Sequence, residues 1–135
     1  MPVPASIATK LRLRVLQFYV LLVLTTYFGV ARSDLGQTLA GSDLFLHYAG
    51  YMVLMISARI ALGQHQMLLF TGLLVYSIAI EIIQYFLPYR TFSIMDILAN
   101  LAGLGAGSLI WWLGYRYYQQ KPAASNHVSN GGEQG

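Results

Sequence analysis

The sequence contains no cysteine and few charged residues, and acidic residues are especially rare. Its 135 residues include five Asp and Glu, eight Lys and Arg, and no Cys, and only 10% are charged. The absence of cysteine excludes disulfides, thiolate zinc sites and cysteine nucleophiles. A soluble domain usually has about 25% charged residues, so this chain has too few to cover a globular surface. The composition therefore argues against a soluble enzyme, a disordered chain and a nucleic-acid-binding protein.

Hydrophobic residues make up 56% of the chain, and the mean hydropathy is +0.55. A membrane-spanning helix needs ~20 mostly apolar residues, because the hydrocarbon core of a bilayer is ~30 Å thick. Four such runs are present, at roughly residues 13–30, 44–62, 67–87 and 94–115. We therefore predict an all-α, polytopic membrane protein, a four-transmembrane-helix bundle that occupies residues 13–115.

The basic residues predict how the bundle is oriented. Six of the eight Lys and Arg fall on one side of the predicted spans and two on the other. The positive-inside rule makes the richer side cytoplasmic. We therefore expect both termini (residues 1–12 and 116–135) in the cytoplasm, a multi-pass protein of the inner membrane, and a disordered tail. The six are Lys10, Arg12, Arg14, Arg59, Arg116 and Lys121, and the two are Arg32 and Arg90.

The first run permits a second interpretation. Basic residues at 10–14 before an apolar stretch are typical of a signal peptide, and Gly29, Val30 and Ala31 resemble a cleavage site. Cleavage would leave three spans and place the new amino terminus outside.

The few acidic residues gather near the ends of the predicted spans. Glu133 lies in the tail and Asp34 in the first outer loop, whereas Asp43, Glu81 and Asp96 lie at or inside span ends, with Glu81 about two turns before the end of the third run. An acidic residue at the centre of a membrane helix costs ~2.5–3.5 kcal/mol, and less near the interface. Acids kept in such positions are usually functional or paired. With the orientation above, all three lie toward the outer leaflet.

Each of these three acids has a polar companion on its own helix face, because residues three or four apart are neighbours on a helix. The pairs are Asp43 with His47, Glu81 with Gln84, and Asp96 with Asn100. Three helices thus bring polar pairs to one membrane depth.

The connection between the third and fourth runs adds a cation to this group. Pro88 ends the third helix, so Arg90 is the cation nearest to the carboxylates. Ser93 is the predicted N-cap of the fourth helix, with Asp96 at the third helical position.

The fourth run also has small residues at helical spacing. Ala99, Gly103 and Gly107 form a stripe that lets a neighbouring helix approach closely. The polar face of this run is therefore predicted to point into the bundle.

The same residues resemble the VanZ-like family of small bacterial multi-span membrane proteins. The resemblance covers about residues 42–107, although Leu44 stands where many members have a basic residue and Tyr89 where a glycine is common. It implies an envelope protein, and the family is named for a member linked to resistance to the glycopeptide teicoplanin. The matching stretches are Asp43-x-x-x-His47-x-x-x-Tyr51, Glu81-Ile82-Ile83-Gln84-Tyr85-Phe86-x-Pro88-x-Arg90, and Ser93-x-x-Asp96-Ile97-x-x-Asn100-x-x-Gly103.

We interpret the polar group as a site for an envelope lipid or cell-wall precursor at the outer leaflet. Carboxylates and an imidazole can transfer protons, and an arginine can hold a phosphate or carboxylate in a bidentate grip. With one histidine near the acids and no cysteine, a divalent cation is a lesser option, and we predict no metal or cofactor. The candidates are Asp43, His47 and Glu81 as acid–base or orienting groups, Arg90 as the anion clamp, and Gln84, Asp96 and Asn100 as supporting contacts.

Two other functions are compatible with the pattern. In one, the protein is not an enzyme, and the polar group only holds the helices together while a surface binds another envelope component. In the other, the intramembrane acids relay protons in a transporter. The second is weaker, because the acids lie at one depth and form no chain across the bilayer.

Overall fold

The computed structural model describes residues 5–30, 42–63, 65–90 and 92–120. Within these residues the chain forms four helices, each long and apolar enough to cross a membrane, with mean hydropathies of 1.4 to 1.9 over the candidate spans. The predicted all-α architecture is confirmed, and Arg32, Asp34, Lys121 and Glu133 lie outside the described residues. The helices are α1 (Ala5–Val30), α2 (Ser42–Leu62), α3 (Gln66–Tyr85) and α4 (Ile94–Gln120).

The helix ends differ from the apolar runs in the sequence. Helix α1 begins at Ala5, and α4 continues to Gln120, so both extend beyond the apolar segments into polar and basic residues. A helix of this length is ~39 Å long at 1.5 Å per residue, longer than the ~30 Å hydrocarbon core. The apolar run marks only the part suited to lipid, and good helix formers such as Lys and Arg let the helix continue past it.

The end of α3 corrects the predicted depth of Glu81. Helix α3 ends at Tyr85 rather than at Leu87, because the residue before a proline is pushed out of the helical conformation and Pro88 follows. Glu81 therefore lies about one turn before the helix end, and the predicted two turns are wrong.

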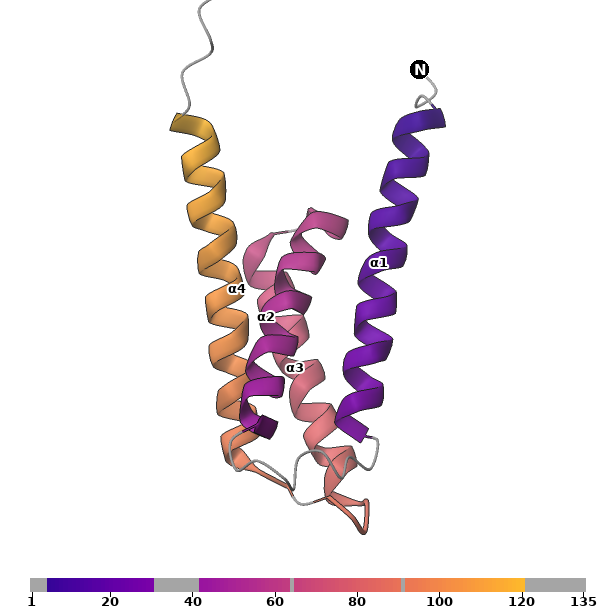
Figure 1. Cartoon of the computed structure of the whole chain (residues 1–135), viewed down its shortest axis with the longest axis vertical. Coiled ribbons are helices and arrows are strands. Elements are labelled where there is room, and N and C mark those ends of the chain that lie inside the picture. Colours follow the sequence, from indigo (N-terminus) through magenta and orange to yellow (C-terminus); the bar gives the residue numbers. More distant parts are fainter. Residues whose placement is uncertain (1–4, 31–41, 64, 91, 121–135) are drawn as a thin grey trace, which may run out of the picture.

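The helices run in alternating directions, and in Figure 1 the ends that carry the acidic residues lie together at the bottom of the bundle. We call this region the polar end: the carboxyl-terminal turns of α1 and α3, the amino-terminal turns of α2 and α4, and the connection before α4. The basic residues Lys10, Arg12, Arg14, Arg59 and Arg116 lie toward the opposite ends of their helices.

Helices α2 and α4 are the most closely packed pair, and two glycines of α4 make this possible. A β-carbon at Gly103 would overlap the carbonyl oxygen of Tyr48, and one at Gly107 would lie 2.6 Å from the carbonyl oxygen of Met52. Both contacts would be too close for a real β-carbon, so only glycine at these two positions allows the α2 backbone to come this near. The predicted close approach at this stripe is confirmed.

The core between the helices is small and apolar at its centre. Leu54, Met55 and Ala58 of α2 and Leu104 of α4 are completely buried. Helix α1 is packed more loosely, since only 6% of its candidate span is buried. Its exposed apolar side chains suit contact with lipid, in which an exposed leucine carries no hydrophobic penalty.

Candidate functional site

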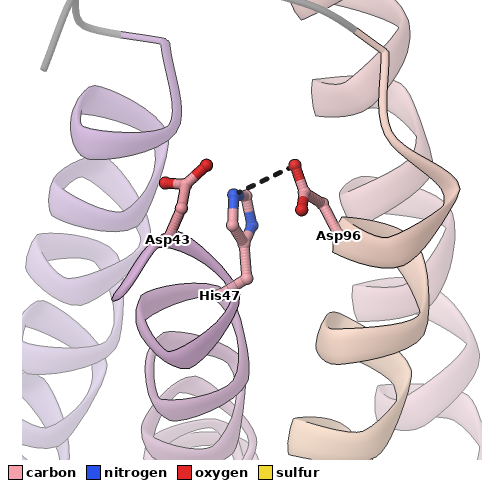
Figure 2. Close-up of side chains that lie close together, drawn as sticks. All are labelled: Asp43, His47 and Asp96. Carbon is pink, nitrogen blue, oxygen red and sulfur yellow. Dashed lines mark ion pairs between the residues drawn. The ribbon is translucent and has the colours of Figure 1, made fainter. Parts of the chain in front are cut away.

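The first part of the site lies where α2 faces α4, and it consists of His47, Asp96 and Asn100. His47 Nε2 lies 3.7 Å from Asp96 Oδ2, and His47 Nδ1 lies 3.2 Å from Asn100 Oδ1. Figure 2 shows the imidazole of His47 between the carboxylates of Asp43 and Asp96. The side chains of His47 and Asp96 are only 9% and 13% exposed. The ring thus joins the two helices through both of its nitrogens.

The hydrogen bond to Asn100 Oδ1 indicates which ring nitrogen carries the proton in neutral His47. The amide Oδ1 can only accept, so Nδ1 donates to it. Nε2 then has a lone pair, and that lone pair is on the side of the ring where Asp96 Oδ2 lies. A lone pair and a carboxylate repel one another unless a proton or a metal cation lies between them.

Asp43 is the most open part of the site, and Arg90 lies beside it. Arg90 Nη1 lies 3.7 Å from Asp43 Oδ2, and the two side chains are 15% and 39% exposed. Arg90 Nη2 also donates a hydrogen bond of 3.2 Å to the carbonyl oxygen of Phe28 in the last turn of α1. A cation at this position is favourable, since the carbonyls of a final helical turn lack partners within the helix and carry partial negative charge.

Glu81 is the most deeply buried acid of the group. Its exposed fraction is 0%, and neither carboxylate oxygen has a hydrogen-bond partner among the described residues. Asp96, His47, the backbone amide of Ser93 and Asp43 are all near enough to interact with it electrostatically, although the Ser93 amide does not meet the geometry of a hydrogen bond. Glu81 therefore belongs to the same charged cluster but lies behind its open side.

Gln84 connects α3 to α1 instead of extending the acidic cluster. Its Nε2 donates a 2.6 Å hydrogen bond to the carbonyl oxygen of Gly29, and the side chain is 1% exposed. The two α1 carbonyls that accept these hydrogen bonds were not predicted from the sequence. The Gly29 carbonyl accepts from Gln84, and the Phe28 carbonyl accepts from Arg90. The available signal was general: the last carbonyls of any helix need partners, and this helix ends without a basic residue in its last turn.

The amino terminus of α4 is capped as predicted. The backbone N–H of Asp96 donates to Ser93 Oγ at 3.3 Å, which satisfies one of the amides that have no partner within the helix. This cap places Asp96 in the first turn of α4, where the helix dipole favours an acidic residue.

The model of the VanZ/LLP1 family matches residues 6–115, which is most of the chain. This chain belongs to the VanZ/LLP1 family. The resemblance seen in residues 42–107 is thus confirmed, and the family match of this VanZ/LLP1 protein also includes α1 from residue 6. No match was found among curated proteins or among solved structures.

All seven residues singled out in the sequence lie at the polar end of this VanZ/LLP1 protein. One ligand atom from each of Asp43, His47 and Asp96 lies within 4.8 Å of the others, which is the tightest group. Glu81 interacts with this trio from a fully buried position, and Arg90 lies beside Asp43. Gln84 and Asn100 act through hydrogen bonds to the α1 backbone and to the His47 ring. The arrangement can hold a cation between its acids or an anion at its arginine.

Proposed function

We propose that this VanZ/LLP1 membrane protein binds the anionic head group of an envelope lipid or lipid-linked cell-wall precursor at the outer leaflet of the cytoplasmic membrane. The observation that carries this proposal is the position of Arg90 beside Asp43, the most exposed member of the Asp43–His47–Asp96 group. Such clusters in a membrane protein are costly and are kept where a polar molecule is handled.

The contacts of Arg90 suit a residue that exchanges one anion for another. Its 3.7 Å distance to Asp43 is longer than the 2.7–2.9 Å of a strong charge-assisted hydrogen bond, so this pair is loose. The second contact, to the carbonyl oxygen of Phe28, orients the guanidinium group. A phosphate can therefore take a bidentate grip from Arg90 while α1 still holds the side chain in place.

The distribution of basic residues supports an outward-facing site. Apart from Arg90, the described Lys and Arg lie toward the helix ends opposite the polar end. The positive-inside rule assigns that opposite side to the cytoplasm. Head groups of the outer leaflet would then lie at the depth of Asp43 and Arg90.

The remaining residues have supporting roles in this proposal. Asp43, His47 and Glu81 orient the head group, and the same three can transfer protons in a reaction on it. Gln84, Asp96 and Asn100 hold these groups in position through their contacts with α1 and α2.

Lipid binding by the purified chain tests the proposal directly. We expect native mass spectrometry to show retention of phosphatidylglycerol or phosphatidic acid in preference to neutral diacylglycerol. Arg90→Gln should reduce this affinity about 10- to 100-fold, since a hydrogen bond to a charged group contributes ~1.5–3 kcal/mol. Arg116→Gln is the matched control, because Arg116 lies over the Trp112 ring near the far end of α4. Equal binding of charged and neutral lipids by the wild type would reject the proposal.

A link to glycopeptide tolerance is the cellular form of the same proposal. A protein that occupies a cell-wall precursor reduces the amount that teicoplanin can reach. Overexpression should then raise the teicoplanin concentration that a susceptible bacterium survives, and Arg90→Gln should remove that effect at equal protein levels. No change on overexpression would separate this chain from the resistance phenotype.

The alternative is a protein whose polar cluster only joins the helices. The interhelical hydrogen bonds of His47 with Asn100 and of Gln84 with Gly29 favour it. Glu81→Gln and His47→Ala distinguish the two. Loss of folded protein in both variants supports the structural alternative, whereas normal folding with loss of lipid binding supports the site.

A further inference from the structure

We propose that Asp43, His47 and Asp96 bind a divalent metal cation, with Glu81 as the buried carboxylate beside it. The three candidate donor atoms lie within 4.8 Å of one another. Two atoms that share one ion at about 2.0–2.4 Å can be at most about 4.8 Å apart, so this spacing fits a common ion. From the sequence alone we predicted no metal, since a lone histidine near acids carries little weight. The convergence of side chains from α2 and α4, seen in Figure 2, is what changes the expectation.

The protonation of His47 is the first argument for an ion. Asn100 Oδ1 accepts from Nδ1, and this leaves the Nε2 lone pair on the side where Asp96 lies. Histidines that bind metals show this arrangement: one nitrogen binds the ion while the other donates to an oxygen that fixes the ring. Asn100 is therefore a positioning residue for His47.

Glu81 is a second and independent argument. Its carboxylate is fully buried, lacks a hydrogen-bond partner among the residues described, and interacts electrostatically with Asp96, His47 and Asp43. A buried polar group without a partner costs free energy, and a bound ion or water is one arrangement that offsets this cost. An ion between the three side chains would give this carboxylate a counter-charge.

The charges of the cluster are also compatible with a bound cation. With all three acids ionised and His47 neutral, Asp43, Glu81 and Asp96 contribute −3 and Arg90 contributes +1, a sum of −2. A divalent ion makes the cluster neutral. Neutrality is important at this position, because uncompensated charge within the membrane is strongly unfavourable.

The donor set indicates which ions to expect. Carboxylate oxygens suit Mg²⁺, Ca²⁺ and Mn²⁺, whereas imidazole nitrogen suits Zn²⁺ and other transition metals. One imidazole with carboxylates favours Mn²⁺ or Zn²⁺ over Mg²⁺ and Ca²⁺. Asp43, the most exposed of the three ligands at 39%, provides the side from which water or a ligand completes the coordination.

Metal content of the purified full chain tests the proposal with the metal alone as the probe. The protein, carrying an affinity tag without histidine, is stripped with EDTA, incubated with Mn²⁺, Zn²⁺, Mg²⁺ or Ca²⁺, and desalted before elemental analysis. We expect about one Mn²⁺ or Zn²⁺ per chain and little Mg²⁺ or Ca²⁺. Failure of the wild type to retain any of these ions overturns the proposal, whatever the variants show.

Variants identify the ligands. His47→Ala and Asp96→Asn should weaken Mn²⁺ binding at least 10- to 100-fold, measured from the free Mn²⁺ signal by electron paramagnetic resonance. His65→Ala and Glu133→Gln are matched controls that remove a histidine and a carboxylate elsewhere, and they should leave the affinity unchanged. Asp43→Asn changes the most exposed ligand and gives a further test if a buried variant does not fold. Unchanged affinity in folded His47→Ala or Asp43→Asn protein overturns the assignment.

This inference and the proposed function can fail separately. The metal experiment contains no added lipid, and the lipid experiment depends on Arg90 rather than on the ion. Ion binding without a preference for anionic lipid would support the metal site and reject the head-group proposal. A preference for anionic lipid without ion binding would support the head-group proposal and reject the metal site.

Discussion

Among individual residues, Glu81 has the most demanding environment. It is an acid in a membrane helix, fully buried, with two carboxylates nearby and no hydrogen-bond partner among the residues described. An arrangement of this kind reduces stability, and proteins retain it where a ligand or a reaction needs it. Mutation of Glu81 should therefore preserve or raise the stability of the protein while it impairs the function.

We expect Glu81→Gln to leave the metal-free protein equally stable or more stable. Glutamine has nearly the same shape and no charge, so the variant avoids the cost of placing an acid in this buried position. Thermal unfolding in detergent with EDTA measures this difference. A clear fall in the unfolding temperature would show that the Glu81 carboxylate holds the bundle together, contrary to our proposals.

We expect the opposite result at Gln84. Its 2.6 Å hydrogen bond to the Gly29 carbonyl joins α3 to the end of α1 in a buried position. Gln84→Leu puts an apolar side chain of similar size at this position and leaves that carbonyl without its partner, at a cost of about 1–3 kcal/mol. The unfolding temperature should fall, while Ile83→Leu on the neighbouring exposed position should change it little. Equal stability of the two variants would show that this bond contributes nothing.

At the scale of helices, the contact between α2 and α4 depends on glycine. The backbone of α2 lies against Gly103 and Gly107, and this approach brings Asp43 and His47 within reach of Asp96 and Asn100. A β-carbon added at Gly105 of the same helix would meet no atom within 4 Å. The two kinds of glycine therefore allow a matched comparison.

Gly103→Ala should destabilise the protein by about 1–3 kcal/mol, because the added methyl group would overlap the backbone of α2, which cannot rotate away. Gly105→Ala should be neutral or slightly stabilising, since alanine is the better helix former. Thermal unfolding of both variants measures the difference. The reverse order would contradict the packing of α2 on α4.

The helices and the site were predictable from sequence to different extents. The four apolar runs and the pairs Asp43–His47 and Asp96–Asn100 follow from spacing along one chain, so they could be recognised before any fold was known. The partner that each side chain finds on another helix depends on helix rotation and separation. For this reason the sequence did not indicate that Gln84 would bond to the backbone of α1 instead of to an acid. The actual ends of α1 and α4 were also missed, because hydropathy marks lipid contact and not helix length.

At the scale of the whole molecule, the orientation in the membrane is the prediction that most affects function. The chain has no cysteine, so single cysteines can be introduced and labelled without background. Tyr89→Cys lies beside Arg90 at the polar end, and His65→Cys lies between α2 and α3 at the other end. We expect a membrane-impermeant maleimide to label Tyr89→Cys in spheroplasts and His65→Cys only after lysis. The reverse pattern would place the polar end in the cytoplasm and reject an outer-leaflet ligand.

The origin of the site residues on separate helices has a consequence for biosynthesis. Asp43 and His47 enter the membrane with α2, Glu81 follows with α3, and Asp96 and Asn100 arrive only with α4. Until the last helix is inserted, His47 lacks the side chains that orient it, and the earlier acids lack a complete binding partner. A chain interrupted before α4 thus exposes unsatisfied polar groups to lipid. Enzymes that degrade incomplete membrane proteins can distinguish it from the finished protein by these groups.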